Sequence, residues 1–171
     1  MKSLIWITAV LTVFCLMLSI WHPASAETNL NLYFGASNIK VNDISADLDG
    51  GRSAVIGGRL EYWAQQTPFL GIGFDVSSFK TGQDNLLTES VMAILRVPLG
   101  KDVIHSQGRF FTYLALGPAL ISGAKIEPAL VFRFGAEWLV DINIGFFAEH
   151  RLLNGTGFDV NQFIGGVAFK F

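Results

Sequence analysis

Residues 131–138 read VFRFGAEW, and this stretch alternates between two very different kinds of side chain. Phe132 and Phe134 share one parity, whereas Arg133 and Glu137 occupy the other. Successive side chains of a β-strand point to opposite faces of the sheet. An extended segment therefore places aromatic rings on one face and full charges on the other, and the fold has to satisfy both faces.

The same period of two recurs along most of the chain. In 69–79, for example, the apolar Phe74 and Val76 flank Asp75. Such alternation is the signature of a β-strand. Each segment has about ten residues, which is the length that a tilted strand needs to cross a bilayer. Eight segments share the pattern: 29–37, 55–63, 69–79, 90–99, 109–121, 127–138, 142–151 and 161–171.

The character of the two faces decides between a soluble sheet and a membrane barrel. A soluble sheet turns its polar face to water and its apolar face to a packed core. Here the apolar face is uniform and aromatic, whereas the other face mixes glycines with isolated charges. Lipid outside and polar residues inside fit this pattern, and a sheet in hydrocarbon must close to pair its edges. We therefore predict an all-β fold, an eight-stranded antiparallel transmembrane up-and-down β-barrel.

The charged face should then line the interior of the barrel. An eight-stranded barrel is just wide enough for side chains to fill it. An unpaired buried charge is costly, so acidic and basic groups inside are expected to pair with one another. We predict a lumen plugged by a structural ion network of Arg59, Glu61, Asp75, Arg96, Arg133, Glu137, Glu149 and Arg151, with Glu127 and Lys170 nearer the rims.

Two sets of connections join the strands. The set with the longest loop is expected outside the cell, because such barrels have short periplasmic turns and longer extracellular loops. The extracellular set is 38–53, 80–88, 122–125 and 152–158, and the periplasmic set is 65–68, 99–108 and 139–141.

Side chains at the strand ends add two expectations. Aromatic residues at the periplasmic ends should form an interfacial girdle. Pro118 and Pro128 fall in strands that should pair on both sides, so a bulge or the end of pairing is expected at each. The predicted girdle consists of Tyr62, Trp63, Phe69, Phe110, Trp138 and Phe171.

The first 26 residues have the parts of a secretory signal peptide. Lys2 supplies a positive charge, 4–20 is a continuous apolar run, and 24–26 reads ASA, a small-residue cleavage site. An uncleaved anchor helix is the alternative, since the apolar run is almost long enough to span a bilayer. Cys15 lies in this leader, so the mature chain has no cysteine. We predict a signal peptide at 1–26 and one outer-membrane β-barrel domain at 27–171.

The mature chain is mildly acidic. Removing Lys2 from the 12 lysines and arginines leaves 11 basic residues, against 14 acidic ones. Nucleic-acid binding requires a basic surface, so we do not expect a nucleic-acid partner. After the leader, a charge, glycine or asparagine interrupts every apolar run before it is long enough for a membrane helix.

The C-terminal residues FIGGVAFKF (163–171) place Phe163, Val167, Phe169 and Phe171 at alternate positions. This ending resembles the terminal strand of bacterial outer-membrane barrels, which the barrel-assembly machinery recognises. The whole mature chain resembles small outer-membrane barrels of the OmpA/OmpX type. The resemblance implies an outer-membrane location, a monomer, and contact with outer-membrane lipids and lipopolysaccharide. The other segments that carry it are GRLEYW (58–63), FLGIGFDVSSF (69–79), LALGPAL (114–120) and FFAEHRLL (146–153).

One enzymatic interpretation is weighed against this. Lipid A deacylases of the PagL type are similar barrels with a His-x-Ser-Asn motif near the outer end of the next-to-last strand. His150 matches the histidine, but Leu152 stands at the nucleophile position. A serine hydrolase needs Ser beside a base and an orienting acid, and Ser90 and Ser122 come from other strands. We therefore expect no catalytic residues.

A metal or cofactor is not expected either. Asp43, Asp47 and Asp49 suggest part of a calcium loop, but no Glu stands at the twelfth position. The sequence thus predicts a non-enzymatic outer-membrane barrel whose surface loops serve structural or interaction roles. An outer-leaflet lipid A modifying enzyme and a narrow pore for small solutes are the alternatives.

Overall fold

The computed structural model describes residues 26–41, 51–64, 69–82, 84–99, 110–123 and 125–171. Within these ranges no helix is long and apolar enough to span a membrane. The predicted leader up to residue 25, the acidic residues of 42–50 and most of 99–108 lie outside the described residues. The strands are β1 (Ala26–Val41), β2 (Gly51–Ala64), β3 (Leu70–Thr81), β4 (Asp84–Leu99), β5 (Phe110–Ser122), β6 (Ile126–Leu139), β7 (Ile144–Gly155) and β8 (Phe158–Lys170).

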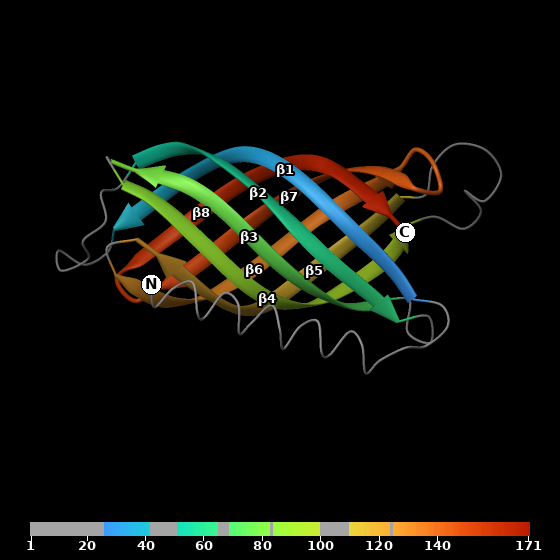
Figure 1. Ribbon diagram of the computed structural model, residues 1–171, viewed down its shortest axis with the longest axis horizontal. Helices are drawn as coiled ribbons and strands as arrows, with labels where there is room; N and C mark the ends of the chain where they lie inside the picture. The colour runs from blue at the N-terminus through green and yellow to red at the C-terminus, as the bar shows by residue number, and fades with distance from the viewer. Residues whose placement is uncertain (1–25, 42–50, 65–68, 83, 100–109, 124) are drawn as a thin grey trace.

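The eight strands close into one antiparallel barrel (Figure 1). Each strand pairs with the next, and β8 returns to pair with β1. At this seam Thr28 N donates to Phe171 O at 3.2 Å, and Phe171 N donates to Thr28 O at 2.9 Å. The predicted closed, eight-stranded antiparallel architecture is therefore confirmed. We call the end where β1 begins and β8 ends the termini end, and the opposite end the hairpin end.

The strands are longer at the hairpin end than the sequence pattern predicted. The expected loop 80–88 instead belongs almost entirely to β3 and β4, and 152–158 is strand apart from Thr156 and Gly157. Gly157 adopts a φ of 85°, which favours glycine in this tight turn. Of the expected loop 38–53, residues 38–41 belong to β1 and 51–53 belong to β2. The predicted boundaries of these three loops are wrong, whereas the fourth, 122–125, agrees with the end of β5 at Ser122 and the start of β6 at Ile126.

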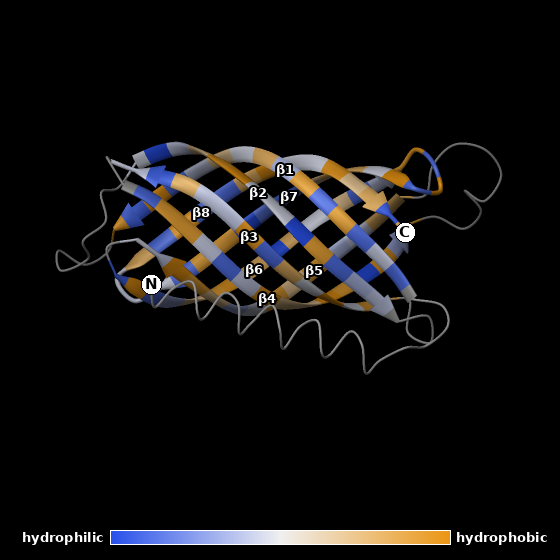
Figure 2. Ribbon diagram, in the orientation of Figure 1, coloured by the Kyte–Doolittle hydropathy of each residue, from blue (hydrophilic) through white to orange (hydrophobic). Residues whose placement is uncertain are grey.

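The physical reason is that the polarity of the two faces inverts along the barrel. Over the middle of the barrel the outward Phe34 is 73% exposed while the inward Asp75 is 0% exposed. Toward the hairpin end the inward side chains become apolar, as with the buried Phe79, and most outward ones become polar, as with the exposed Arg52, although Ile126 on β6 stays apolar and exposed. Apolar and polar segments alternate along the strands in Figure 2. A sequence pattern that requires the apolar residues to keep one parity therefore ends the predicted strand where this inversion occurs.

The two prolines for which a break in pairing was expected, Pro118 and Pro128, lie where ladder pairing is lost. The β4–β5 ladder is interrupted between the pairs Ser90↔Ala119 and Ala93↔Leu116, and Pro118 lies in this gap. The last β6–β7 pair at the hairpin end joins residues 129 and 155, so Pro128 lies one residue beyond it. Proline lacks the backbone N–H donor. At Pro118 the pairing with β4, and at Pro128 the pairing with β7, does not need this donor.

Two adjacent glycines give a test of the close-packed interior. A Cβ on the inward Gly166 would collide with the carbonyl oxygen of Leu32 and lie 2.8 Å from atoms of Phe147 and Tyr33. Gly166→Ala should therefore lower the free energy of unfolding by about 1–3 kcal/mol through overpacking. The measurement is a urea titration of the refolded chain in detergent.

Gly165→Ala is the matched control for this prediction. Gly165 faces outward, and the nearest atom to an added Cβ would be the Phe147 carbonyl oxygen at 3.7 Å. Its stability should change by no more than about 0.5 kcal/mol. Equal effects at the two glycines would contradict the assignment of Gly166 to the interior.

Candidate functional site

The inward charges of the middle strands form one buried cluster, which we call the central cluster. It contains three arginines and three carboxylates, so its formal charges balance. Every member is at most 5% exposed. The members are Arg59 and Glu61 on β2, Asp75 on β3, Arg133 on β6, and Glu149 and Arg151 on β7.

Arg151 joins opposite walls of the barrel. Its guanidinium donates to Asp75 Oδ1 at 3.0 Å and to Oδ2 at 2.9 Å. Tyr33 donates its hydroxyl to Asp75 Oδ1 at 2.8 Å, and the guanidinium lies 5.0 Å from the centre of the Tyr33 ring. Bidentate arginine–carboxylate pairs are among the strongest charge-assisted contacts in proteins. This contact therefore fixes β3 against β7 across the lumen.

Glu149 is the hub of the remaining contacts. Its Oε2 lies 2.8 Å from Arg59 Nη1 and accepts a hydrogen bond from the Tyr113 hydroxyl at 2.7 Å. Arg59 Nε is 2.6 Å from Glu61 Oε1. Arg133 is held more loosely, at 3.4 Å from Glu61 and 3.6 Å from Glu149. The two tyrosines carry the inward parity of their strands, which is the signal that could have added them to the predicted network.

A second group, the mouth cluster, lies at the termini end and consists of Arg96, Lys170, Glu27 and Glu137. Arg96 Nη1 is 2.9 Å from Glu27 Oε1. Lys170 Nζ is 3.2 Å from Glu27 and 3.0 Å from Glu137. Two cations therefore face two carboxylates. The structure brings all eight predicted network residues into the interior, but it divides them between two clusters.

At each end of the barrel, one acidic residue differs from its predicted place in the ion network. The first predicted strand begins at residue 29, yet β1 begins at Ala26 and carries Glu27 into the mouth cluster. Glu127 was counted with the network but lies half-buried near the start of β6, at the hairpin end. The central and mouth clusters together contain five positive and five negative groups. This balance includes Glu27 and does not include Glu127.

The assignment of Trp63 to the aromatic girdle is wrong. Trp63 is 3% exposed and lies in the lumen, with the Arg96 guanidinium 4.2 Å from its ring centre. It has the same parity as Glu61, and this parity is stronger information than its position at a strand end. Of the other five girdle residues, Tyr62 is half-exposed, and Phe110, Trp138 and Phe171 are exposed on the outer face. Phe69 is also exposed, but it lies just before β3 and has the inward parity of that strand.

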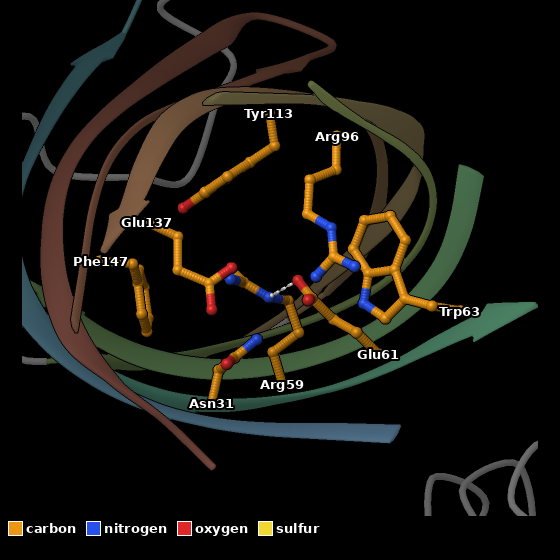
Figure 3. Close-up of a pocket in the computed structure, with 8 residues that line it drawn as sticks. All are labelled: Asn31, Arg59, Glu61, Trp63, Arg96, Tyr113, Glu137 and Phe147. Atoms are coloured by element: carbon orange, nitrogen blue, oxygen red, sulfur yellow. Dashed lines mark ion pairs between the residues drawn. The ribbon is translucent and has the colours of Figure 1, made fainter. Parts of the chain in front are cut away.

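A small cavity lies between the two clusters (Figure 3). Its volume of about 10 Å³ matches the space of a single water. In the described part of the chain, Trp63 Nε1 and Asn31 Oδ1 have no hydrogen-bond partner, and both residues line this cavity. The lining residues are Asn31, Arg59, Glu61, Trp63, Arg96, Tyr113, Glu137 and Phe147.

Apolar side chains fill the lumen at the hairpin end, and we call this layer the apolar cap. Phe158 is 0% exposed and Phe79 is 2% exposed. The sequence pattern predicts only ions in the lumen and does not predict this layer, because most of its residues fall in predicted loops or at predicted strand ends. The cap consists of Ile39, Val55, Phe79, Leu86, Ile121, Val131, Leu153, Phe158 and Val160.

The remaining predicted residues lie on the outer face. Phe163 and Phe171 are 65% and 78% exposed, and Val167 and Phe169 are half-exposed. Their alternation on β8 matches the pattern on which an assembly signal was predicted, and that role stays a prediction. Among the described residues no group of His, Cys, Asp and Glu has the arrangement of a metal site.

His150 also faces outward, away from any hydroxyl nucleophile suggested by the sequence. Its ring stacks on Phe163 at a centroid distance of 4.5 Å and meets Phe134 edge-on at 5.3 Å. Ser90 is buried in the lumen, on the other side of the barrel wall, and Ser122 ends β5. These positions do not assemble the serine–histidine pair that a deacylase of this type needs.

Neither a protein-family model nor a curated protein sequence matches the chain. Solved structures do. Neisserial surface protein A aligns with a TM-score of 0.62 at 13% identity, over 86% of this chain and 99% of that one. The N-terminal β-barrel domain of Pseudomonas aeruginosa OprF gives 0.57 at 13% identity, over 85% and 97%. Ail, the attachment invasion locus protein of Yersinia pestis, gives 0.52 at 15% identity, over 86% and 99%.

These neighbours are small eight-stranded outer-membrane barrels, which agrees with the resemblance to the OmpA/OmpX type. At such low identities the likeness concerns the fold. The chain therefore has the fold of a small eight-stranded outer-membrane barrel, and the arguments for its location and role have to come from its own side chains.

The pairing in the central cluster can be tested at Arg151. Arg151→Met should lower the free energy of unfolding by about 3–5 kcal/mol, because it leaves Asp75 buried without its cation. The double variant Arg151→Met/Asp75→Leu should be more stable than Arg151→Met alone, since removing both charges leaves neither one unpaired. Urea unfolding in detergent measures both.

Lys80→Met serves as the control for charge removal as such. Lys80 is exposed on the outer face of β3, so its replacement should change stability by no more than about 0.5 kcal/mol. If the double variant is no more stable than Arg151→Met alone, Asp75 does not depend on Arg151 as its partner.

Proposed function

We propose that this chain is a small outer-membrane β-barrel protein of the Gram-negative type with a non-enzymatic, structural or interaction role. The observation that carries the proposal is the inverted barrel: charges lie inside a closed wall whose outer face is apolar. Phe34, Ile56 and Phe163 are 73%, 67% and 65% exposed. A large exposed apolar surface is rare on soluble monomers, and a bilayer is the solvent that accepts it.

The extent of the apolar outer face supports this location. The strands have 12 to 16 residues, whereas about 9–11 residues of a tilted strand cross the hydrocarbon. The surplus lies at the hairpin end, where inward residues form the apolar cap and outward residues are polar on β1, β2, β3, β7 and β8, whereas Ile126 on β6 stays apolar and exposed. Over most of its circumference this end has the polarity of a small soluble barrel and would stand in water beyond the membrane.

Three exposed cations mark one side of the hairpin end. Lys40, Arg52 and Lys80 lie on the adjacent strands β1, β2 and β3, beyond the last outward apolar residues of those strands. Cations at this height would meet the phosphates of lipid headgroups. These cations support the proposed contact with lipopolysaccharide, and the proposed orientation has the hairpin end outside the cell. Monomeric state and recognition by the barrel-assembly machinery belong to the same proposal.

A closed lumen follows from two unlike layers. The central and mouth clusters fill the middle of the lumen and its termini end with paired charges, and the cap fills the hairpin end with apolar side chains. An open pore needs a continuous polar path, and the apolar cap interrupts one. A catalytic role is disfavoured because the inward charges are paired with one another and His150 faces away from the candidate serines.

A planar-bilayer recording tests the closed lumen. Purified wild-type protein should produce no steady conductance, because paired charges and the apolar cap leave no continuous water path. A general porin inserted under the same conditions is the positive control. A reproducible open channel of uniform size would contradict the closed lumen and favour the narrow-pore alternative.

A further inference from the structure

A groove of about 690 Å³ crosses the outer face of the barrel from β5 to β1. Its floor is a line of small side chains that pair one after another across the strands. Thr112 pairs with Ala136, Ala136 with Ala148, and Ala148 with Gly165. Gly165 in turn pairs with Phe34, whose ring stands beyond it. Neighbouring strands lie about 4.8 Å apart, so the three steps from Thr112 to Gly165 make this line roughly 14 Å long.

His150 stands in the wall of this groove, surrounded by apolar residues. Along β7 its outward neighbours are Ala148 and Leu152, and the paired residues on either side are Phe134 and Phe163. The Phe134 ring meets the imidazole edge-on, and the Phe163 ring stacks on it. The position is therefore within the apolar band, and not at its polar margin.

The imidazole brings hydrogen-bonding capacity to this apolar surface. A neutral histidine has one donor and one acceptor nitrogen. Within the described part of the chain, neither nitrogen of His150 is hydrogen-bonded. An ionisable side chain at such a depth in hydrocarbon is costly, and it usually marks a functional position.

We propose that this groove binds one lipid acyl chain that carries an oxygen, as a hydroxyl or an ester, at the depth of His150. The inference rests on the proposed function, since it requires that the outer face meets hydrocarbon. One leaflet of a hydrocarbon core of about 30 Å is about 15 Å thick, so an acyl chain of one leaflet matches the length of the floor. His150 donates to, or accepts from, that oxygen.

The shape of the groove favours a flexible chain over a second barrel. Phe34 and Phe163 project strongly from the wall, whereas His150 is only half-exposed and the floor is recessed beneath them. A rigid barrel wall would rest on the projecting rings and leave the floor and the imidazole uncovered. An acyl chain fits between the rings and reaches both.

The test places the full mature chain in nanodiscs that contain equal amounts of two phosphatidylcholines. One carries stearoyl chains and the other carries 12-hydroxystearoyl chains, so the only difference is a hydroxyl deep in the chain. Native mass spectrometry then counts the lipids that remain bound after release from the disc. Wild type should retain the hydroxylated lipid about fivefold over the other, the ratio expected for one net hydrogen bond.

Three variants separate the parts of the site. His150→Phe keeps the ring and should abolish the preference for the hydroxyl while a chain is still retained. Ala148→Leu fills the floor and should reduce retention of both lipids. Ala93→Leu is the matched control, because Ala93 is also an exposed outward alanine but lies on β4, away from the groove, and it should behave as wild type.

Each other outcome overturns the inference. No preference in wild type, or a preference that survives His150→Phe, removes the role of His150. Equal retention in Ala148→Leu and Ala93→Leu means that only ordinary surrounding lipid is bound. A wild-type dimer that Ala148→Leu converts to a monomer assigns the groove to a second copy. A chain that does not enter nanodiscs refutes the proposed function itself, whereas one that inserts without preference refutes the groove alone.

Discussion

Charge neutrality inside a narrow closed wall is the constraint on which this structure depends. A buried ion without a partner is strongly destabilising, and an eight-stranded barrel has no room to solvate one. The chain meets this constraint twice, with three cations and three anions in the central cluster and two of each in the mouth cluster. Contacts such as Arg151–Asp75 join strands from opposite walls, so the charges that must pair also fix the barrel's cross-section. Glycines such as Gly166 leave the space that these side chains occupy.

The same alternation of side chains is used in two opposite senses along the barrel. In the middle the polar parity points inward, and at the hairpin end the apolar parity does. In the proposed membrane setting this inversion accounts for strands that are longer than the hydrocarbon core requires, and it gives the hairpin end a packed core of its own. It also places the apolar cap directly above the ion clusters, so the lumen is filled by two kinds of contact that would respond to different perturbations.

Much of this was predictable from periodicity, and the failures have a common origin. Parity alone predicted the eight strands and the inward position of all eight network residues. Parity also predicts the inward position of Trp63, whereas its nearness to a strand end suggests the outer face. Phe79, Leu86 and Phe158 were missed because their strands reverse polarity. Glu27 was missed because it precedes the first predicted strand. Which charges pair cannot be read from the sequence, since Arg151 and Asp75 are 76 residues apart and meet only across the closed barrel.

The two tryptophans of the mature chain lie on opposite sides of the wall, which allows a direct test of the central claim. Of the four tryptophans, two precede residue 27 and belong to the predicted leader, and the other two are Trp63 in the lumen and Trp138 on the outer face. Trp63→Phe and Trp138→Phe each leave a single fluorophore in the mature protein, which is reconstituted in bilayers with brominated acyl chains. Bromine should quench Trp138 strongly and Trp63 hardly at all. Equal quenching of the two, or stronger quenching of Trp63, would contradict a barrel with its charges inside and its apolar face in lipid.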